Sequence, residues 1–275
     1  NDETPEPILS EEIYKLTSID KLDNMSFSSP LERAALFRLA EEQEIPTAKA
    51  EVISRVINIS RQNIGEGIPD LGTVGQIFSS QLMSMEPTSE LIWFAGNAVR
   101  ALIAAGLYDR AMEWLNLSRL YSRTSIEASE VSVALWPIER QLQPGTSNFI
   151  TPIRLKRWSD TRPKNSLNDD KLFLLSSLTA LGDSISQSEW IDLMDRRVNV
   201  STSIPATQIW EGLKLASEEK KVGETILFSI LSLSNIDLVN VSPIVLSRII
   251  KSLIEVGLER QARNISVEAM ILRGL

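Results

Sequence analysis

The chain has 275 residues, of which 43% are hydrophobic and 23% are charged, a balance typical of a folded globular protein with a substantial core. Its net charge of −8 argues against broad nucleic-acid binding, which needs concentrated positive charge. Because the sequence contains neither cysteine nor histidine, it excludes disulfides, thiolate zinc sites, cysteine nucleophiles and Ser-His-Asp hydrolases, and we expect no metal and no cofactor.

The predicted elements begin after residues 1–7, an acidic, proline-containing segment that we expect to be a disordered tail. Ser29 followed by Pro30 predicts the start of a helix, and Pro46 is expected to end it. Three glycines and a proline predict a loop at residues 65–72. Apolar side chains at helical spacing predict further helices at 47–59, 74–85, 89–105, 108–121 and 125–143.

Residues 144–168 break this pattern with three prolines and clustered polar residues, and they are the predicted linker or functional loop. They divide the chain into two helical repeat regions, residues 8–143 and residues 169–275. In the second region, helical spacing recurs at 169–181, 187–198, 206–217, 221–234, 243–256 and 259–273. No apolar run reaches the roughly 20 residues that a membrane-spanning helix needs.

Two segments of the chain match each other, RALIAAGLYDRA at residues 100–111 and KSLIEVGLERQA at residues 251–262. In each, a glycine, Gly106 or Gly257, is expected to end a helix in a left-handed conformation. A small residue five positions later, Ala111 or Ala262, allows the returning helix to approach closely. The sequence therefore predicts two antiparallel helical hairpins.

The spacing Gly106-x-Tyr108-x-x-Ala111 resembles the inter-helix turn of the tetratricopeptide repeat. The resemblance covers about 30 residues around each glycine. It is partial, because Val99 and Leu102 stand where the family usually has a small residue and an aromatic residue. Glu259 replaces the turn aromatic in the second copy. Degenerate pairs are expected at 31–59 and 206–234, with Ala48 and Gly223 as their close-packing residues.

The resemblance implies an all-α fold of antiparallel helix pairs, stacked as a right-handed superhelical array with irregular repeats. An irregular helical bundle is the alternative.

A local reversal of charge marks the predicted loop, where residues 154–164 hold five basic residues and one acid. Such a segment can bind an acidic partner. The candidate partner-binding residues are Arg154, Lys156, Arg157, Trp158 and Arg162. In the alternative interpretation the segment is solvated and Trp158 belongs to the core.

We expect a non-enzymatic scaffold that binds a protein or peptide in the groove of its stack. The alternative is an all-α enzyme that acts on cell-wall glycan with two carboxylates from separate parts of the chain. A third reading is a domain of a larger assembly. The acidic start without methionine favours an exported, periplasmic bacterial chain or an excised domain over a cytoplasmic protein.

Overall fold

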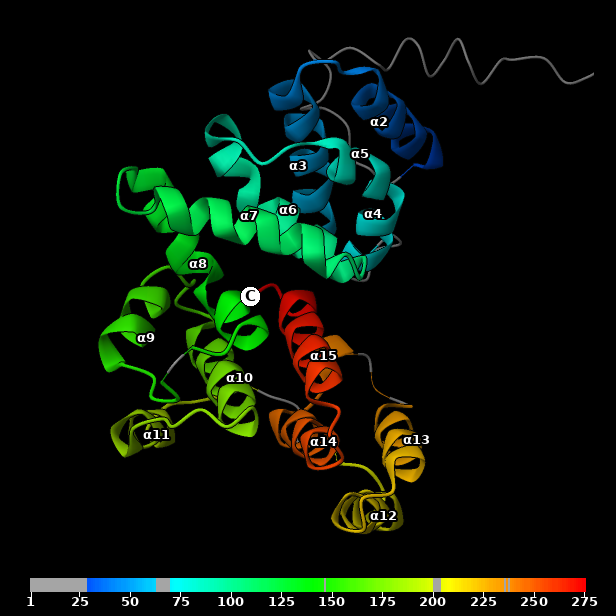
Figure 1. Ribbon diagram of the computed structural model, residues 1–275, viewed down its shortest axis with the longest axis vertical. Helices are drawn as coiled ribbons and strands as arrows, with labels where there is room; N and C mark the ends of the chain where they lie inside the picture. The colour runs from blue at the N-terminus through cyan, green and yellow to red at the C-terminus, as the bar shows by residue number, and fades with distance from the viewer. Residues whose placement is uncertain (1–28, 63–69, 146, 200–203, 235, 237) are drawn as a thin grey trace, which may run out of the picture. The chain divides into compact units, whose positions relative to one another are not determined.

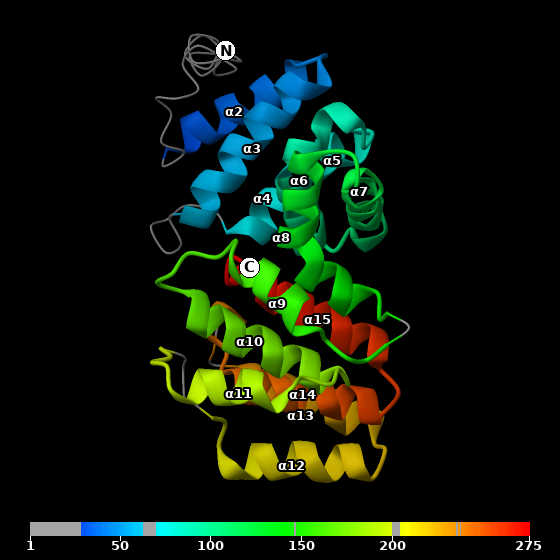
Figure 2. The ribbon, with the colours of Figure 1, turned by 90° about the vertical axis from the view of Figure 1, so that its left-hand side faces the viewer.

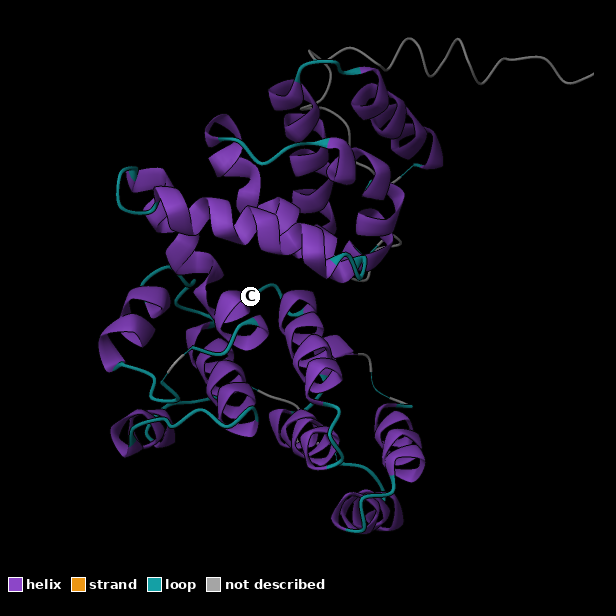
Figure 3. Cartoon of the chain, in the orientation of Figure 1, coloured by secondary structure: helices purple, strands orange, loops and turns teal. Residues whose placement is uncertain are grey.

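The computed structural model describes residues 29–62, 70–145, 147–199, 204–234, 236 and 238–275. Within these residues the chain is helical and has no β-strand, only an isolated bridge between Phe149 and Ser184 (Figure 3). The all-α prediction is confirmed for this part of the chain. The predicted tail at 1–7 and most of the predicted loop at 65–72 lie outside the described residues.

The chain divides into two compact units, Asn1–Ser132 and Val133–Leu275. The division falls within helix α8 (Ile126–Leu142), before the segment 144–168 that the sequence predicts as a linker. Pro137 lies inside this helix, and a proline has no N–H to donate to the carbonyl four residues earlier. That carbonyl belongs to Val133, the first residue of the second unit.

The first unit is built around helix α6, which contacts α3, α4 and α7 (Figure 2). Its core includes Phe94, whose ring meets the Trp114 ring edge-on at a centroid distance of 5.7 Å. The α-helices of this unit before α8 are α2 (Pro30–Glu42), α3 (Pro46–Gln62), α4 (Leu71–Ile77), α5 (Ser79–Ser84), α6 (Ile92–Ala104) and α7 (Tyr108–Tyr121), with a 3₁₀ turn η2 (Ser89–Leu91).

Helices α2 and α3 both begin with a proline. Ser29 caps α2 as predicted, since its Oγ accepts the Leu31 N–H at 3.2 Å. Pro46 does not end α2 as expected but is the first residue of α3. A proline suits this position, because the first helical N–H has no acceptor within the helix and the ring already holds φ near its helical value.

The second unit is built around helix α14, which contacts α10, α12, α13 and α15 (Figure 1). The α-helices of this unit after α8 are α9 (Pro152–Ser159), α10 (Leu167–Ala180), α11 (Gln187–Met194), α12 (Thr207–Glu218), α13 (Val222–Leu233), α14 (Pro243–Glu255) and α15 (Glu259–Leu272), with a 3₁₀ turn η3 (Leu238–Asn240). Helix α9 lies inside the segment 144–168, so this segment is not a continuous loop. Pro152, one of its three prolines, starts the helix rather than breaking one.

Two hairpins, α6–α7 and α14–α15, contain the matching segments of the sequence. Their first helices have 13 residues and their second helices 14. The glycines that follow the first helices, Gly106 and Gly257, have φ of +78° and +84°. The next N–H, from Leu107 or Leu258, reaches back to Leu102 O or Leu253 O at 2.8 Å in each turn. Ala111 and Ala262 are fully buried.

A third hairpin, α12–α13, has the same turn with a lysine in place of the glycine. Lys220 has φ of +59°, and the Lys221 N–H reaches Ala216 O at 2.9 Å. Gly223, the expected close-packing residue, faces open space, and the buried small residue is Thr225. In the α2–α3 pair the fully buried small residue is likewise Ala50 rather than the expected Ala48. Both expectations are wrong by two residues. In α12–α13 the buried small residue stands five positions after Lys220, just as Ala111 and Ala262 stand five positions after their glycines.

Candidate functional site

The basic segment presents three of its five candidate residues to solvent, all on helix α9. Lys156 and Arg157 are exposed, and so is Arg154. The guanidinium of Arg154 lies 5.6 Å from the ring centroid of Trp136, and its Nη2 lies 3.9 Å from Glu139 Oε2. An exposed pair at this distance contributes little to stability, so these cations remain available to an acidic partner.

The other two candidates of the basic segment have structural roles. Trp158 is 1% exposed and belongs to the core, as the alternative interpretation proposed. Arg162 donates from Nε to Asp170 Oδ2 at 2.9 Å and from both terminal nitrogens to Gly274 O at 3.3 Å. It therefore holds the end of the chain and the start of α10 together. Both side chains are therefore occupied by contacts within the second unit.

A cleft of about 430 Å³ opens beside the basic segment, between α9, α10 and α11. Lys171 at its wall lies 2.7 Å from Glu189 Oε2 and 3.0 Å from Asp192 Oδ2. Hydrogen bonds from Arg196 and then Lys171 hold the pKa of Asp192 below its ordinary value. A general acid needs the opposite shift, so Asp192 is not suited to the general-acid role of a glycosidase.

The other acidic pairs of the sequence lie either in an ion pair or on the surface. Asp170 is buried in the ion pair with Arg162, and Glu41, Glu42, Glu218 and Glu219 lie on the surface. In the described part of the chain, no three Asp or Glu side chains gather as a metal site would require. No described helix is long and apolar enough to cross a membrane.

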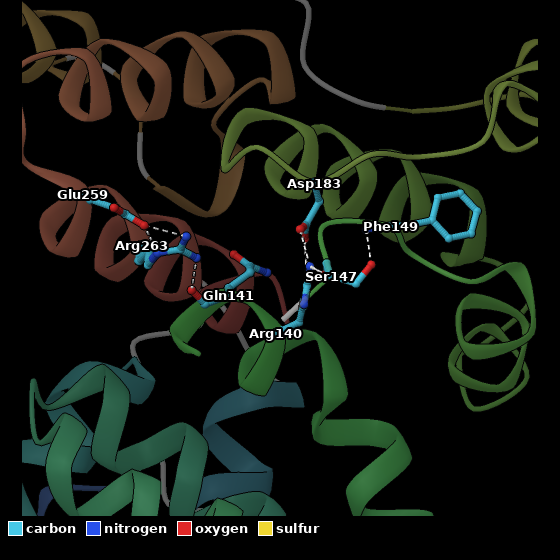
Figure 4. A network of polar contacts seen from close by, with 7 residues as sticks. All are labelled: Arg140, Gln141, Ser147, Phe149, Asp183, Glu259 and Arg263. Atoms are coloured by element: carbon cyan, nitrogen blue, oxygen red, sulfur yellow. Dashed lines mark hydrogen bonds and ion pairs between the residues drawn. The ribbon is translucent and has the colours of Figure 1, made fainter. Parts of the chain in front are cut away.

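A polar network joins the end of α8 to the rest of the second unit (Figure 4). Arg140 donates to both carboxylate oxygens of Asp183, at 3.0 and 2.5 Å, and to Ser147 O at 2.7 Å. The neighbouring Gln141 accepts from Ser266 Oγ at 2.5 Å, and its backbone carbonyl accepts from Arg263 at 2.8 Å. The donors and acceptors of this network satisfy one another's hydrogen-bonding capacity, so the network has a structural role.

Helix α13 has an unusual distribution of side chains. Its buried residues are hydroxyl-bearing: Thr225, Ser229 and Ser232 are each at most 6% exposed. Each hydroxyl donates to a backbone carbonyl four residues earlier in the chain, at 2.7 to 2.8 Å. Because these bonds satisfy the hydroxyls, the small side chains can be buried without an unpaired polar group.

The opposite face of α13 is aliphatic and exposed. Its four large side chains are between 38% and 60% exposed, and we call them the α13 apolar surface: Ile226, Leu227, Ile230 and Leu231. A surface helix of a globular protein usually has the reverse arrangement, with its apolar stripe toward the core. Helix α13 therefore has the composition of a helix that is covered on both sides.

The α13 apolar surface borders a groove of about 350 Å³ that α13, α14 and α15 form together. Ile249 and Leu253 of α14 and Ile265 of α15 contribute apolar side chains to this groove, and Gln261 and Glu268 of α15 contribute polar ones. An apolar centre with polar edges is the usual anatomy of a protein interface. Sequence analysis missed this site. The sequence signal for this site is the segment VGETILFSILSL of α13. Its threonine and serines recur on one face of the helix, and large apolar residues occupy the other faces.

The chain matches no protein-family model, and searches of curated proteins and of solved structures found no match to it. The tetratricopeptide resemblance consequently stays a prediction from the spacing Gly106-x-Tyr108-x-x-Ala111. The functional argument rests on the surfaces described above.

Proposed function

We propose that the protein is a non-enzymatic helical scaffold that binds a partner protein through the α13 apolar surface and the adjoining groove. The observation that carries this proposal is the reversed polarity of α13, with Thr225 and Ser229 inside and Ile230 and Leu227 outside. Contiguous exposed aliphatic side chains mark protein-interaction sites on soluble proteins.

Covering this surface would contribute a substantial part of the free energy of binding. Complete burial of one leucine or isoleucine side chain contributes about 1.5–3 kcal/mol relative to full exposure. The four residues are each about half exposed, so covering them contributes several kcal/mol before the costs of association. Aliphatic side chains of the groove would add to this sum.

The partner segment that fits best is an amphipathic helix. The groove runs between α13 and α15, and its apolar residues come from three helices. A helix placed there would bury one apolar stripe and leave its polar face in water, as in other helix-in-groove complexes. Stacked hairpins of the tetratricopeptide kind, which we propose for α12–α13 and α14–α15, would place this groove between successive pairs.

We assign an accessory role to the exposed basic residues Arg154, Lys156 and Arg157 of α9. In a protein with a net charge of −8 they form a local positive patch. Such rim charges mainly increase the association rate with an acidic partner and contribute little to the final affinity.

The experiment compares affinity capture from source cells by the wild-type chain, by Ile230→Glu and by the matched control Leu120→Glu. Leu120 is 71% exposed on α7, outside the α13 apolar surface. We expect a stoichiometric partner that wild type and Leu120→Glu retain and that Ile230→Glu loses by about tenfold or more, because a buried glutamate would be unpaired. Equal retention by both variants would contradict the proposal.

A further inference from the structure

A second groove lies on another side of α14, away from the α13 apolar surface. It has a volume of about 330 Å³ and is formed by α10, α11, α12 and α14. Figure 1 shows α11 and α12 nearly end-on, with α10 above α11 and α14 above α12. Trp190 of α11 and Trp210 of α12 line the groove, together with Arg248 and Lys251 of α14.

The floor of this groove is fixed by a contact between its two central helices. Ser247 Oγ of α14 donates to Ser176 O of α10 at 3.1 Å, and both residues line the groove. Helices α10 and α14 also pack closely along their length. The cations of α14 are therefore presented from a rigid element, which reduces the entropy lost when a ligand binds.

Arg248 and Lys251 are three residues apart, so they lie on the same face of α14. Neither has a hydrogen bond or an ion pair within the described residues, and the Nε–H of Arg248 is buried without an acceptor. Other basic groups of this unit differ: Arg140, Arg162 and Lys171 each contact a carboxylate. None of the described residues that line this groove is acidic.

The two tryptophans supply aromatic surface beside the cations, on which an apolar group of a ligand can pack. Trp190 and Trp210 are half-buried, so each ring is held by its helix while part of it remains accessible. Tryptophan and arginine are the residues most enriched among those that dominate binding energy at interfaces. A ligand that matches both would carry negative charge beside an apolar group.

We infer that this groove binds an acidic peptide segment in which carboxylates alternate with an apolar side chain. The carboxylates would accept from Arg248 and Lys251, and the apolar side chain would pack between the tryptophans. The groove is open to solvent along one side, whereas small-molecule sites usually enclose most of their ligand. This site is distinct from the α13 apolar surface and does not depend on the proposed function.

The test is calorimetric titration of the full chain with an acetylated peptide of alternating glutamate and leucine. A peptide of alternating glutamine and leucine is the neutral control, and hexanoate represents a free organic acid. We expect the acidic peptide to bind at least about tenfold more tightly than either control, since the neutral peptide has no carboxylate and hexanoate has only one. Affinity should also fall as salt is added.

The double variant Arg248→Gln/Lys251→Gln should lose about tenfold or more in affinity for the acidic peptide. The variant Lys164→Gln/Arg260→Gln changes the net charge equally at exposed positions outside the groove and should bind as wild type does. Trp210→Leu should weaken binding of the acidic peptide, with circular dichroism confirming that the variant is folded.

Four results would overturn the inference. The first is the absence of peptide binding to the wild-type chain at millimolar concentration. The second is an equal loss in both double variants, which would indicate attraction by overall charge. The third is hexanoate binding as tight as peptide binding, which would assign the groove to a small organic acid. Loss of peptide binding in Ile230→Glu alone would instead place the peptide on the α13 apolar surface, and this too would contradict the inference.

Discussion

At the scale of single residues, Lys220 is the position where the sequence conflicts most directly with the backbone. It occupies the left-handed turn position that glycine fills at residues 106, 182, 257 and 274, and its φ is +59°. A residue with a Cβ loses about 1–2 kcal/mol in this conformation relative to the right-handed helix. Its Nζ compensates in part, because it donates to Glu255 O at 2.6 Å.

We therefore predict that Lys220→Gly increases the free energy of unfolding by about 0.5–1 kcal/mol, the backbone strain relieved being larger than the exposed hydrogen bond lost. Urea denaturation followed by circular dichroism measures this difference. Gly257→Ala is the reciprocal control, since it introduces the same strain at φ of +84° and should lower stability. A Lys220→Gly protein less stable than wild type would show that the Lys220–Glu255 contact outweighs the strain.

Some residue-level features could be predicted from the sequence, and others could not. Gly106 and Gly257 were identifiable because glycine ends helices for a local reason. The turn at Lys220 gives no such signal, because lysine rarely adopts a positive φ. The sequence points instead to Gly223 as the close-packing residue. Trp158 and Arg162 were read as partner-binding residues from local charge. In the structure Trp158 packs in the core and Arg162 donates to the distant carbonyl of Gly274. Only tertiary packing brings these contacts about, so local charge could not predict them.

At the scale of elements, the crossing of α4 over α6 depends on the absence of one side chain. A Cβ built on Gly75 would lie 2.3 Å from Ala101 O, and this backbone atom has little freedom to move. The two helices therefore approach within a distance that only glycine permits at this position.

We predict that Gly75→Ala lowers the free energy of unfolding by about 1–3 kcal/mol, the usual range for overpacking in a close-packed core. Thermal unfolding followed by far-UV circular dichroism is the measurement. Gly223→Ala on α13 is the matched control, since a Cβ there meets nothing within 4 Å and alanine is the better helix former. If Gly75→Ala unfolded at the wild-type temperature, α4 and α6 would not be in contact as described.

Helix positions were the most predictable elements, because apolar spacing and proline directly reflect helix geometry. Segment 144–168 was less predictable. Its prolines suggested a break, yet Pro152 begins α9. The α13 apolar surface was also missed, since apolar spacing alone does not show which face of a helix lies inside. Only the burial of Thr225 and Ser229 made the exposed aliphatic face apparent.

At the scale of the whole molecule, both candidate binding surfaces belong to the unit Val133–Leu275. The groove beside the α13 apolar surface and the tryptophan-lined groove lie on different faces of α14, so the same helix helps to form both. Their chemistry differs, since the first offers aliphatic area and the second offers cations beside aromatic rings. The unit could therefore hold two segments of a partner, with affinity increased by their linkage.

The central claim is that another protein covers α13. We would incorporate a photo-crosslinking benzoylphenylalanine at position 230 and, as a control, at position 120, both of which are exposed aliphatic positions in the full chain. After irradiation in source cells, we predict a discrete crosslinked protein from position 230 and none from position 120. A product common to both positions, or no product from position 230, would contradict the claim.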